Sequence, residues 1–210
     1  MQLPTAFLNV AGNTPTIGVL ALQGDFREHL AVLTALGVNA IPVRRPEELA
    51  VVAGLIIPGG ESTVIDKLSR LFGLAEPVKA AIAAGLPVYG TCAGLIMLAD
   101  RVQDSIEGQQ SFGGFNVTVR RNAFGNQLDS FEVDLEVPVL GETPVHAVFI
   151  RAPVVESVGD GVEILAQLDD GRIVAVQQGN LLGTSFHPEV TGETRFHKRF
   201  IDIVAASVVD

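Results

Sequence analysis

The chain has 210 residues, a formal net charge of −10 at pH 7 and 48% hydrophobic residues. This length and apolar content suit a folded domain with a sizeable core and argue against disorder. No basic cluster stands out, which argues against nucleic acid or an anionic membrane as a partner. A single cysteine excludes an internal disulfide and a cysteine-rich metal site. No apolar run approaches the roughly 18 residues of a transmembrane helix, so we expect a cytoplasmic protein.

Strand and helix patterns alternate along the first half of the chain. We expect residues 1–15 to be a flexible N-terminal extension without the features of a signal peptide, and residues 16–210 to be one domain. Asp25 is expected to cap a helix, with Glu28 completing a capping box. The alternation predicts a parallel sheet with helices on both faces. The expected strands are 17–22, 38–43, 54–57 and 87–89, and the expected helices follow Asp25, run through Val64, Leu68 and Leu71, span 76–84 and follow Cys92.

Past about Gly113 the patterns are mostly those of strands with short turns. The turn at residues 169–171 reads as a hairpin, and a helix with Phe196, Phe200 and Val204 on one face closes the chain. We therefore expect a single α/β domain whose sheet becomes mixed in its second half. The strand-like segments are 115–119, 131–137, 145–150, 162–168, 173–177 and 181–186.

The only cysteine, Cys92, lies in a Gly-x-Cys-x-Gly turn between a strand pattern and an apolar helix pattern. This is the layout of a nucleophile elbow with cysteine in place of serine. The helix N-terminus favours the reactive thiolate and directs free amides toward a substrate. A lone cysteine is more often a small buried hydrophobic residue. The glycine frame favours the catalytic interpretation, provided that a base is nearby.

His187 and Glu189 offer that base and its partner. Pro188 favours an extended conformation at His187, and residues two apart in an extended chain point to the same face. Glu189 can then hold one imidazole nitrogen while the other faces a thiol. The competing interpretation is a loop histidine beside a solvated carboxylate. His29 and His197 fall in helix patterns with charged neighbours and are expected on solvated faces, and His146 has no carboxylate two residues on.

A second glycine-rich turn, residues 58–63, follows the third expected strand. Strand ends of this kind bind ligands in open α/β sheets, and the free amides there suit an anion. The turn lacks the lysine of a phosphate-binding loop. A plain tight turn with Ser62 or Thr63 as helix cap explains it equally well. Arg121 and Arg151 are candidate carboxylate binders, although single arginines are usually solvated.

The order Cys…His-x-Glu with a glycine-rich turn upstream resembles class I glutamine amidotransferases, and within them the glutaminase subunits of pyridoxal 5′-phosphate synthase. The resemblance covers nearly all of residues 16–205 and implies a flavodoxin-like fold with a mixed, mostly parallel sheet flanked by helices. The turn at 90–94 and the run at 186–189 mark only the superfamily. The segments that carry the narrower match are residues 18–29, 55–63, 121–132 and 148–153.

The resemblance also implies the reaction and the partner. L-Glutamine is hydrolysed to glutamate and ammonia through a thioester on Cys92, with His187 and Glu189 completing the triad. No cofactor or metal is implied. The ammonia passes to a TIM-barrel synthase subunit, whose dodecameric core carries up to one glutaminase per synthase subunit. The residues implied to hold glutamine are Gly60, Glu61, Ser62, Arg121, Ile150 and Arg151, and the backbone amides of Gly60 and Ala93 are implied to form the oxyanion hole.

One departure and two alternatives accompany this resemblance. Asn126 lies where the family often has arginine, which bears on the partner surface or the glutamine pocket. The first alternative is the glutaminase of another amidotransferase, against which residues 121–125 and 149–153 argue. The second is a non-catalytic redox or binding module on the same fold, against which the intact His187-x-Glu189 pair argues.

Overall fold

The computed structural model describes residues 15–123 and 130–208. Asn126 and all of the predicted extension except Pro15 lie outside these ranges. The first half contains β1 (Ile17–Leu20), α1 (Phe26–Ala35), β2 (Ala40–Val43), α2 (Pro46–Leu49), β3 (Gly54–Ile57), α3 (Ser62–Leu71), α4 (Ala75–Ala83), β4 (Val88–Thr91), α5 (Ala93–Leu98) and β5 (Ala99–Gln103). The second half contains β6 (Phe115–Arg120), β7 (Ser130–Leu135), the 3₁₀ helix η2 (Pro138–Leu140), β8 (Val145–Ile150), β9 (Val154–Val158), β10 (Glu163–Gln167), β11 (Ile173–Gln178), β12 (Leu181–Thr184), α6 (Pro188–Thr191) and α7 (Arg195–Ser207).

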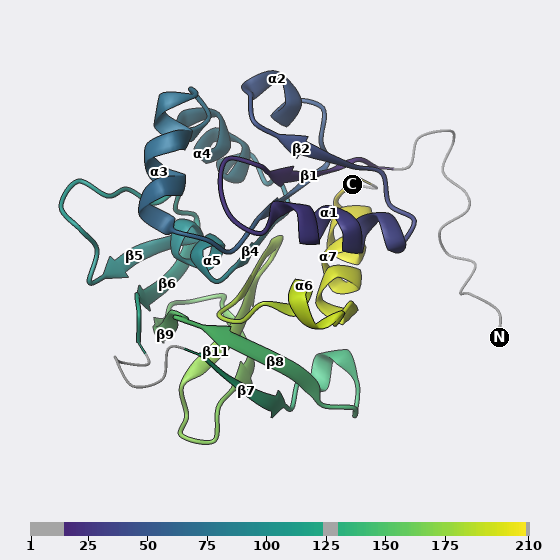
Figure 1. The fold of residues 1–210 in the computed structure, drawn as a ribbon, viewed down its shortest axis with the longest axis vertical. Coiled ribbons are helices and arrows are strands. Elements are labelled where there is room, and N and C mark those ends of the chain that lie inside the picture. The colour runs from purple at the N-terminus through teal and green to yellow at the C-terminus, as the bar shows by residue number, and fades with distance from the viewer. Residues whose placement is uncertain (1–14, 124–129, 209–210) are drawn as a thin grey trace.

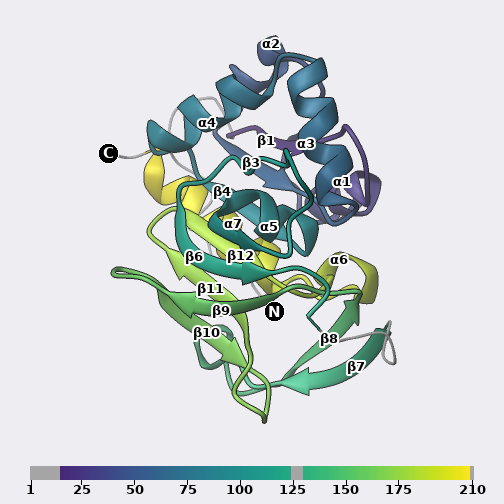
Figure 2. The same cartoon turned by 90° about the vertical axis from the view of Figure 1, so that its left-hand side faces the viewer.

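A ten-stranded sheet forms the centre of the described structure (Figure 2). Its strands lie in the order β2-β1-β3-β4-β12-β11-β9-β6-β5, with β10 paired to β11. The neighbours from β2 to β12 are parallel, whereas β12–β11, β11–β9 and β9–β6 are antiparallel. The predicted mixed, mostly parallel sheet and the predicted hairpin between β10 and β11 are confirmed. β7 and β8 pair with each other in a separate antiparallel ribbon.

Helices cover both faces of the parallel part of the sheet. Figure 1 shows α3 and α4 on one side of β4, and α1 and α7 on the other. Alternate residues of β3 divide between these layers: Leu55 and Ile57 belong to the cluster with α3 and α4, and Ile56 to the cluster with α1 and α7. Because both faces are covered, the strand is apolar throughout, as expected for a buried parallel strand.

Four parallel strands end side by side at one edge of the sheet. β1, β3, β4 and β12 are consecutive neighbours, and all run in the same direction. The segments that follow them contain Asp25, Gly60, Cys92 and His187. Segments that are far apart in sequence therefore meet at the carboxyl edge, where open α/β sheets bind their ligands.

Two strands and several boundaries differ from the sequence-based expectation. β5 and β9 were not predicted, and the helix after Cys92 is only six residues long because β5 begins at Ala99. No glycine or proline marks this change from helix to strand, so the sequence carries no stop signal there. β1 ends at Leu20 and β2 begins at Ala40, within the usual error of such boundaries. Within the described ranges, every helix is too short or too polar to cross a bilayer.

Candidate active site

Cys92 lies on the turn that joins β4 to α5 and has a positive φ of 48°. Such a backbone conformation is rare for a residue with a side chain and is held by its surroundings. The Cys92 amide donates to the Thr184 carbonyl of β12 at 2.8 Å. A β-carbon at Gly94 would lie 2.0 Å from the carbonyl oxygen of Ile57, so only glycine lets α5 start this close to β3. The elbow geometry expected from the glycine frame is present.

His187 and Glu189 form the contact that was expected between them, but the backbone that brings them together is not the expected extended chain. His187 Nδ1 lies 2.8 Å from Glu189 Oε1, and both side chains are buried. His187 is the N-cap of α6 and Glu189 lies in the first turn of that helix, so the pair is not in an extended chain. The His187 amide donates to the Val148 carbonyl at 3.0 Å, which ties this turn to β8.

The electrostatics of His187 favour its charged form. Burial lowers its pKa, but hydrogen bonds with the side chains of Cys92 and Glu189 outweigh burial and raise the pKa to about 10. Burial also raises the pKa of Glu189, and the hydrogen bond with His187 works against that rise. Because Glu189 occupies Nδ1, Nε2 is the nitrogen left for the thiol. The arrangement suits a thiolate–imidazolium pair oriented by a carboxylate.

A second carboxylate faces the same imidazole. Asp25 Oδ2 lies 3.4 Å from His187 Nδ1, and the Asp25 side chain is 41% exposed. Asp25 does sit at the N-cap of α1, but its side chain makes no capping hydrogen bond, so the predicted capping box with Glu28 is wrong. Burial is the main reason that the pKa of Asp25 is raised, and His187 opposes this.

Asp25, His187 and Glu189 each offer an atom that could ligate a cation, and these atoms lie within 4.8 Å of one another. However, His187 Nδ1 and Glu189 Oε1 already share a hydrogen bond at 2.8 Å. His187 Nδ1 can ligate a metal only when it carries no proton. The same nitrogen needs a proton to donate a hydrogen bond to the Glu189 carboxylate. A cation bound there would have to displace the proton shared between His187 and Glu189.

The turns that follow β1 and β3 pack against each other beside the triad. A β-carbon at Gly24 would lie 1.8 Å from the Gly59 carbonyl oxygen, so there is no room for a side chain. The Glu61 amide donates to Gln23 Oε1 at 2.7 Å. Among the hydrogen bonds of the described loops and caps, none uses the amide of Gly60 or Ala93. Those two amides are the ones that the resemblance implies for the oxyanion hole.

The predicted glutamine contacts fall into two groups. Arg121 Nη2 donates to Glu61 Oε1 at 2.9 Å, and its Nη1 donates to Gln109 Oε1 at 2.9 Å. Gln109 Nε2 in turn donates to Ser62 Oγ at 3.0 Å. One hydrogen-bonded chain thus joins Glu61, Ser62 and Arg121 through Gln109, a residue that the sequence analysis did not single out.

The second group lies at the end of β8. The Ile150 carbonyl oxygen is 3.9 Å from Cys92 Sγ, so this strand end reaches the nucleophile. Arg151 follows with a positive φ of 46° and an exposed side chain. The structure therefore brings Ile150 to the thiol and places Arg151 next to it at the surface.

Comparison with known proteins agrees with this geometry. Residues 19–206 match the model of the SNO glutamine amidotransferase family. The chain belongs to that family. This amidotransferase is 66% identical over 193 residues to "Pyridoxal 5'-phosphate synthase subunit PdxT" of Clavibacter sepedonicus, with 92% of each chain covered. It is also 66% identical over 188 residues to the protein of the same name from Leifsonia xyli subsp. xyli, covering 90% of this chain and 95% of that one.

Solved structures support the fold class of this amidotransferase. A crystal structure of a glutamine amidotransferase is 48% identical and superposes with a TM-score of 0.84, covering 90% of this chain and 98% of that one. A putative GMP synthase component from Thermoplasma acidophilum superposes with a TM-score of 0.67 at 18% identity, covering 93% of this chain and 96% of that one. The second similarity concerns the fold alone. The predicted α/β fold class is confirmed.

Two histidines of the amidotransferase lie elsewhere than predicted. His29 and His197 were expected on solvated faces, but both are fully buried against each other behind the triad. Their charged sequence neighbours lie on the outer faces of amphipathic helices. The charges next to each histidine therefore indicated an exposed position, although the histidine itself lies on the inner face. Asp25 was missed as a site residue. Its signal was available, because it follows a predicted parallel strand whose end must share an edge with the other strand ends.

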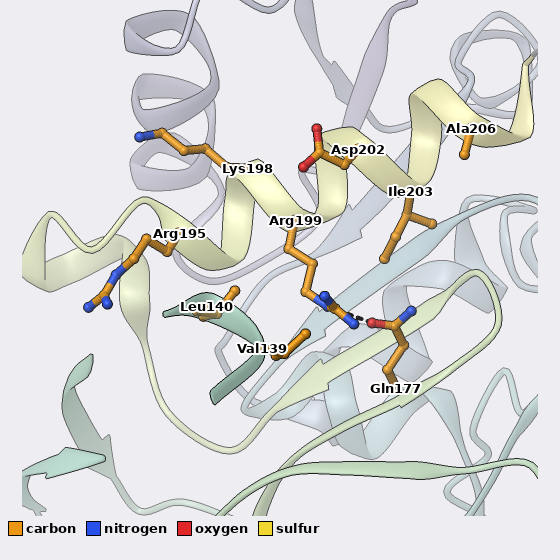
Figure 3. A pocket seen from close by; sticks show the side chains of 9 residues that line it. All are labelled: Val139, Leu140, Gln177, Arg195, Lys198, Arg199, Asp202, Ile203 and Ala206. Carbon is orange, nitrogen blue, oxygen red and sulfur yellow. Dashed lines mark hydrogen bonds between the residues drawn. The ribbon is translucent and has the colours of Figure 1, made fainter. Parts of the chain in front are cut away.

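A surface pocket of about 470 Å³ lies elsewhere on the amidotransferase, between α7 and η2 (Figure 3). Arg199 crosses it to donate to Gln177 at 2.7 Å. None of its lining residues is a predicted catalytic residue or a predicted glutamine contact. The lining residues are Val139, Leu140, Gln177, Arg195, Lys198, Arg199, Asp202, Ile203 and Ala206.

Proposed function

We propose that Cys92, His187 and Glu189 hydrolyse the side-chain amide of L-glutamine. The Cys92 thiolate attacks the amide carbon, and the tetrahedral oxyanion is received by the amides of Gly60 and Ala93. His187 gives its proton to the leaving nitrogen, the C–N bond breaks, and ammonia departs from a glutamyl thioester. Water, deprotonated by His187, then attacks the thioester and releases glutamate and the free thiol.

The observation that supports this proposal most strongly is the hydrogen bond between the His187 imidazole and the Glu189 carboxylate. A buried carboxylate 2.8 Å from His187 Nδ1 fixes the ring, and the raised pKa keeps it protonated beside Cys92. An amide is a poor electrophile whose leaving group must be protonated, so a charged imidazole next to a thiolate is what the first step requires. For glutamine itself we propose Gly60, Glu61, Ser62, Arg121, Ile150 and Arg151 as the contacts.

The name of the relatives indicates which protein receives the ammonia. We assign this chain as the glutaminase subunit of pyridoxal 5′-phosphate synthase, delivering ammonia to the synthase subunit. In the proposed assembly that partner is a TIM barrel in a dodecameric core, with up to one glutaminase docked on each synthase subunit. A cytoplasmic location fits, because a reducing compartment keeps a lone thiol free. Docking would also seal the exposed edge that holds Asp25 and Ile150.

The test is glutamate release from glutamine by the purified chain, alone and with the synthase subunit. We expect turnover that rises when the partner is added and that is abolished by Cys92→Ala. Equal turnover with and without the partner would retain the chemistry and reject this synthase as the partner, pointing to another amidotransferase. Turnover that survives Cys92→Ala would reject the proposed nucleophile.

A further inference from the structure

A second polar cluster lies inside the core directly behind the triad. It consists of His29 on α1, Thr91 at the end of β4 and His197 on α7, and all three residues are fully buried. Burying polar rings costs free energy unless they are hydrogen-bonded. The proposed triad chemistry uses none of them. Since burying these polar groups next to the reacting groups costs free energy, we expect that they serve a function.

His29 contacts both catalytic segments at once. Its Nε2 lies 3.1 Å from Thr91 Oγ1 and 3.6 Å from Glu189 Oε1. Thr91 immediately precedes Cys92, and Glu189 holds His187. On the opposite side of the ring, His29 Nδ1 lies 2.9 Å from His197 Nε2. One imidazole therefore links the nucleophile turn to the carboxylate of the triad, and a second imidazole supports it from behind.

The charge state of the two rings follows from their surroundings. Burial, followed by the neighbouring His197, holds the pKa of His29 well below its usual value, and burial lowers that of His197 to about 4. Both rings are therefore neutral at pH 7, with one N–H each. The backbone of Glu193 works against burial on the pKa of His197. His29 Nδ1 and His197 Nε2 share one hydrogen bond at 2.9 Å, in which one of the two nitrogens carries the proton and the other accepts it.

His29 Nε2 points between Thr91 and Glu189. It is within hydrogen-bond distance of Thr91 Oγ1 and in close contact with Glu189 Oε1. We propose that His29 is a positioning residue of this amidotransferase: its hydrogen bond with Thr91 and its close packing against Glu189 fix the carboxylate relative to the Cys92 turn, and His197 supports the ring from behind. Glu189 Oε1 then has the hydrogen bond with His187 on one side and the His29 ring on the other. This inference rests on the proposed triad.

The test compares four purified variants with the wild-type chain in the presence of its synthase partner. His29→Leu removes both ring nitrogens, and His29→Gln keeps a hydrogen-bonding group near the place of Nε2. Phe200→Leu is the matched control, because its ring packs 5.8 Å from that of Tyr89 in the same core layer and makes no polar contact. Cys92→Ala reports on the nucleophile itself. Thermal unfolding is measured for each variant.

We expect His29→Leu to lower kcat by up to about 100-fold with KM unchanged, as for a misplacement of catalytic groups by about 1 Å. His29→Gln is expected to recover most of that loss, and Phe200→Leu to lower the melting temperature while kcat is retained. Equal losses of kcat in His29→Leu and Phe200→Leu, or no recovery in His29→Gln, would overturn the positioning role. An inactive wild-type chain would instead contradict the proposed function.

A readout without turnover settles the positioning role even in that case. The His187 Nδ1 proton shared with Glu189 gives a downfield imidazole resonance in the proton NMR spectrum. We expect this resonance to shift or broaden in His29→Leu and to stay in place in Phe200→Leu. An unchanged resonance in His29→Leu would show that Glu189 is held without His29, and would overturn the inference.

Discussion

A single imidazole, His187, has two carboxylates within reach of one nitrogen. Glu189 is closer, at 2.8 Å, and is buried, whereas Asp25 is 3.4 Å away and 41% exposed. A charged contact is stronger where water is excluded, so we propose Glu189 as the orienting group. We expect Glu189→Gln to lower kcat by about 10⁴-fold with little change in KM, since replacing the orienting acid of a triad by its amide has an effect of this order.

Asp25→Asn is the matched control for that prediction. It removes a similar charge from the same nitrogen, but at longer range and beside water, so the expected loss of kcat is less than about tenfold. Both variants are measured by glutamate release in the presence of the synthase. A larger loss in Asp25→Asn than in Glu189→Gln would make Asp25 the orienting carboxylate instead.

The raised pKa of His187 predicts that its ring stays charged well above pH 7. The imidazolium persists at pH 7 and is lost only as the pH rises through about 10. In a proton NMR titration, the ring-carbon protons of His187 should therefore keep the shifts of an imidazolium from about pH 7 to 9. In Glu189→Gln, which removes one of the partners that raise this pKa, the same protons should titrate at a lower pH. Wild-type resonances that titrate near pH 6.5, as for an ordinary histidine, would contradict the charged ring.

The three proposed catalytic residues were the part of the site that could best be predicted from the sequence. Cys92, His187 and Glu189 could be proposed because each lies in a short, recognisable sequence pattern. Cys92 lies in a Gly-x-Cys-x-Gly turn, and His187 and Glu189 are two residues apart. Gln109 could not be proposed, because its two hydrogen bonds join segments that are 47 and 12 residues away in sequence. His29 could not either, since its burial depends on α7, which comes at the opposite end of the chain.

At the scale of elements, the nucleophile elbow depends on how closely α5 approaches β3. A β-carbon at Gly94 would meet the Ile57 carbonyl oxygen at 2.0 Å, and a strand backbone cannot yield as a flexible side chain can. We expect Gly94→Ala to lower the free energy of unfolding by about 1–3 kcal/mol or more and to abolish glutamine turnover. Urea unfolding and the glutamate assay provide the two measurements.

Gly85→Ala is the control for the elbow prediction. Gly85 also precedes a strand of the parallel sheet, but a β-carbon there meets nothing within 4 Å, and only its φ of 92° is unfavourable. Its expected cost is about 1 kcal/mol, with turnover per folded molecule unchanged. If Gly94→Ala were no worse than Gly85→Ala in both assays, steric contact with β3 would not be what defines the elbow.

The elements themselves could be predicted where pattern and boundary signals agree. β3 and β8 were expected with the bounds they have, because a proline marks one end of each: Pro58 follows β3 and Pro144 precedes β8. β5 and β9 were missed, since short strands next to a helix or a proline carry little periodic signal. α6 was missed because four residues cannot show a period of 3.6. The contact between His187 and Glu189 was expected even though its local structure was not.

At the scale of the whole molecule, the buried histidines make stability depend on pH. The pKa of His197 falls from 6.5 in the unfolded chain to about 4 in the folded one. Its contribution to stability is therefore fully present above about pH 6.5 and is lost as the pH falls toward 4. We expect the stability advantage of the wild type over His197→Phe to shrink by about 3 kcal/mol between these limits.

Urea unfolding of both proteins at pH 7 and pH 4 measures that difference. Taking the difference between the two proteins cancels the carboxylates, including Glu189 and Asp25, whose raised pKa values act in the opposite direction. An advantage that stays constant or grows toward acid would mean that His197 is not held neutral in the folded protein.

The central claim of this account is that Cys92 forms a covalent thioester with the glutamyl group at the edge where four strands meet. The most direct test is mass spectrometry of the chain after it is mixed with glutamine and its synthase partner and quenched in acid. We predict a glutamyl group on the peptide that contains Cys92 and its absence from Cys92→Ala. Glutamate release without any adduct on Cys92, or an adduct on another residue, would contradict it.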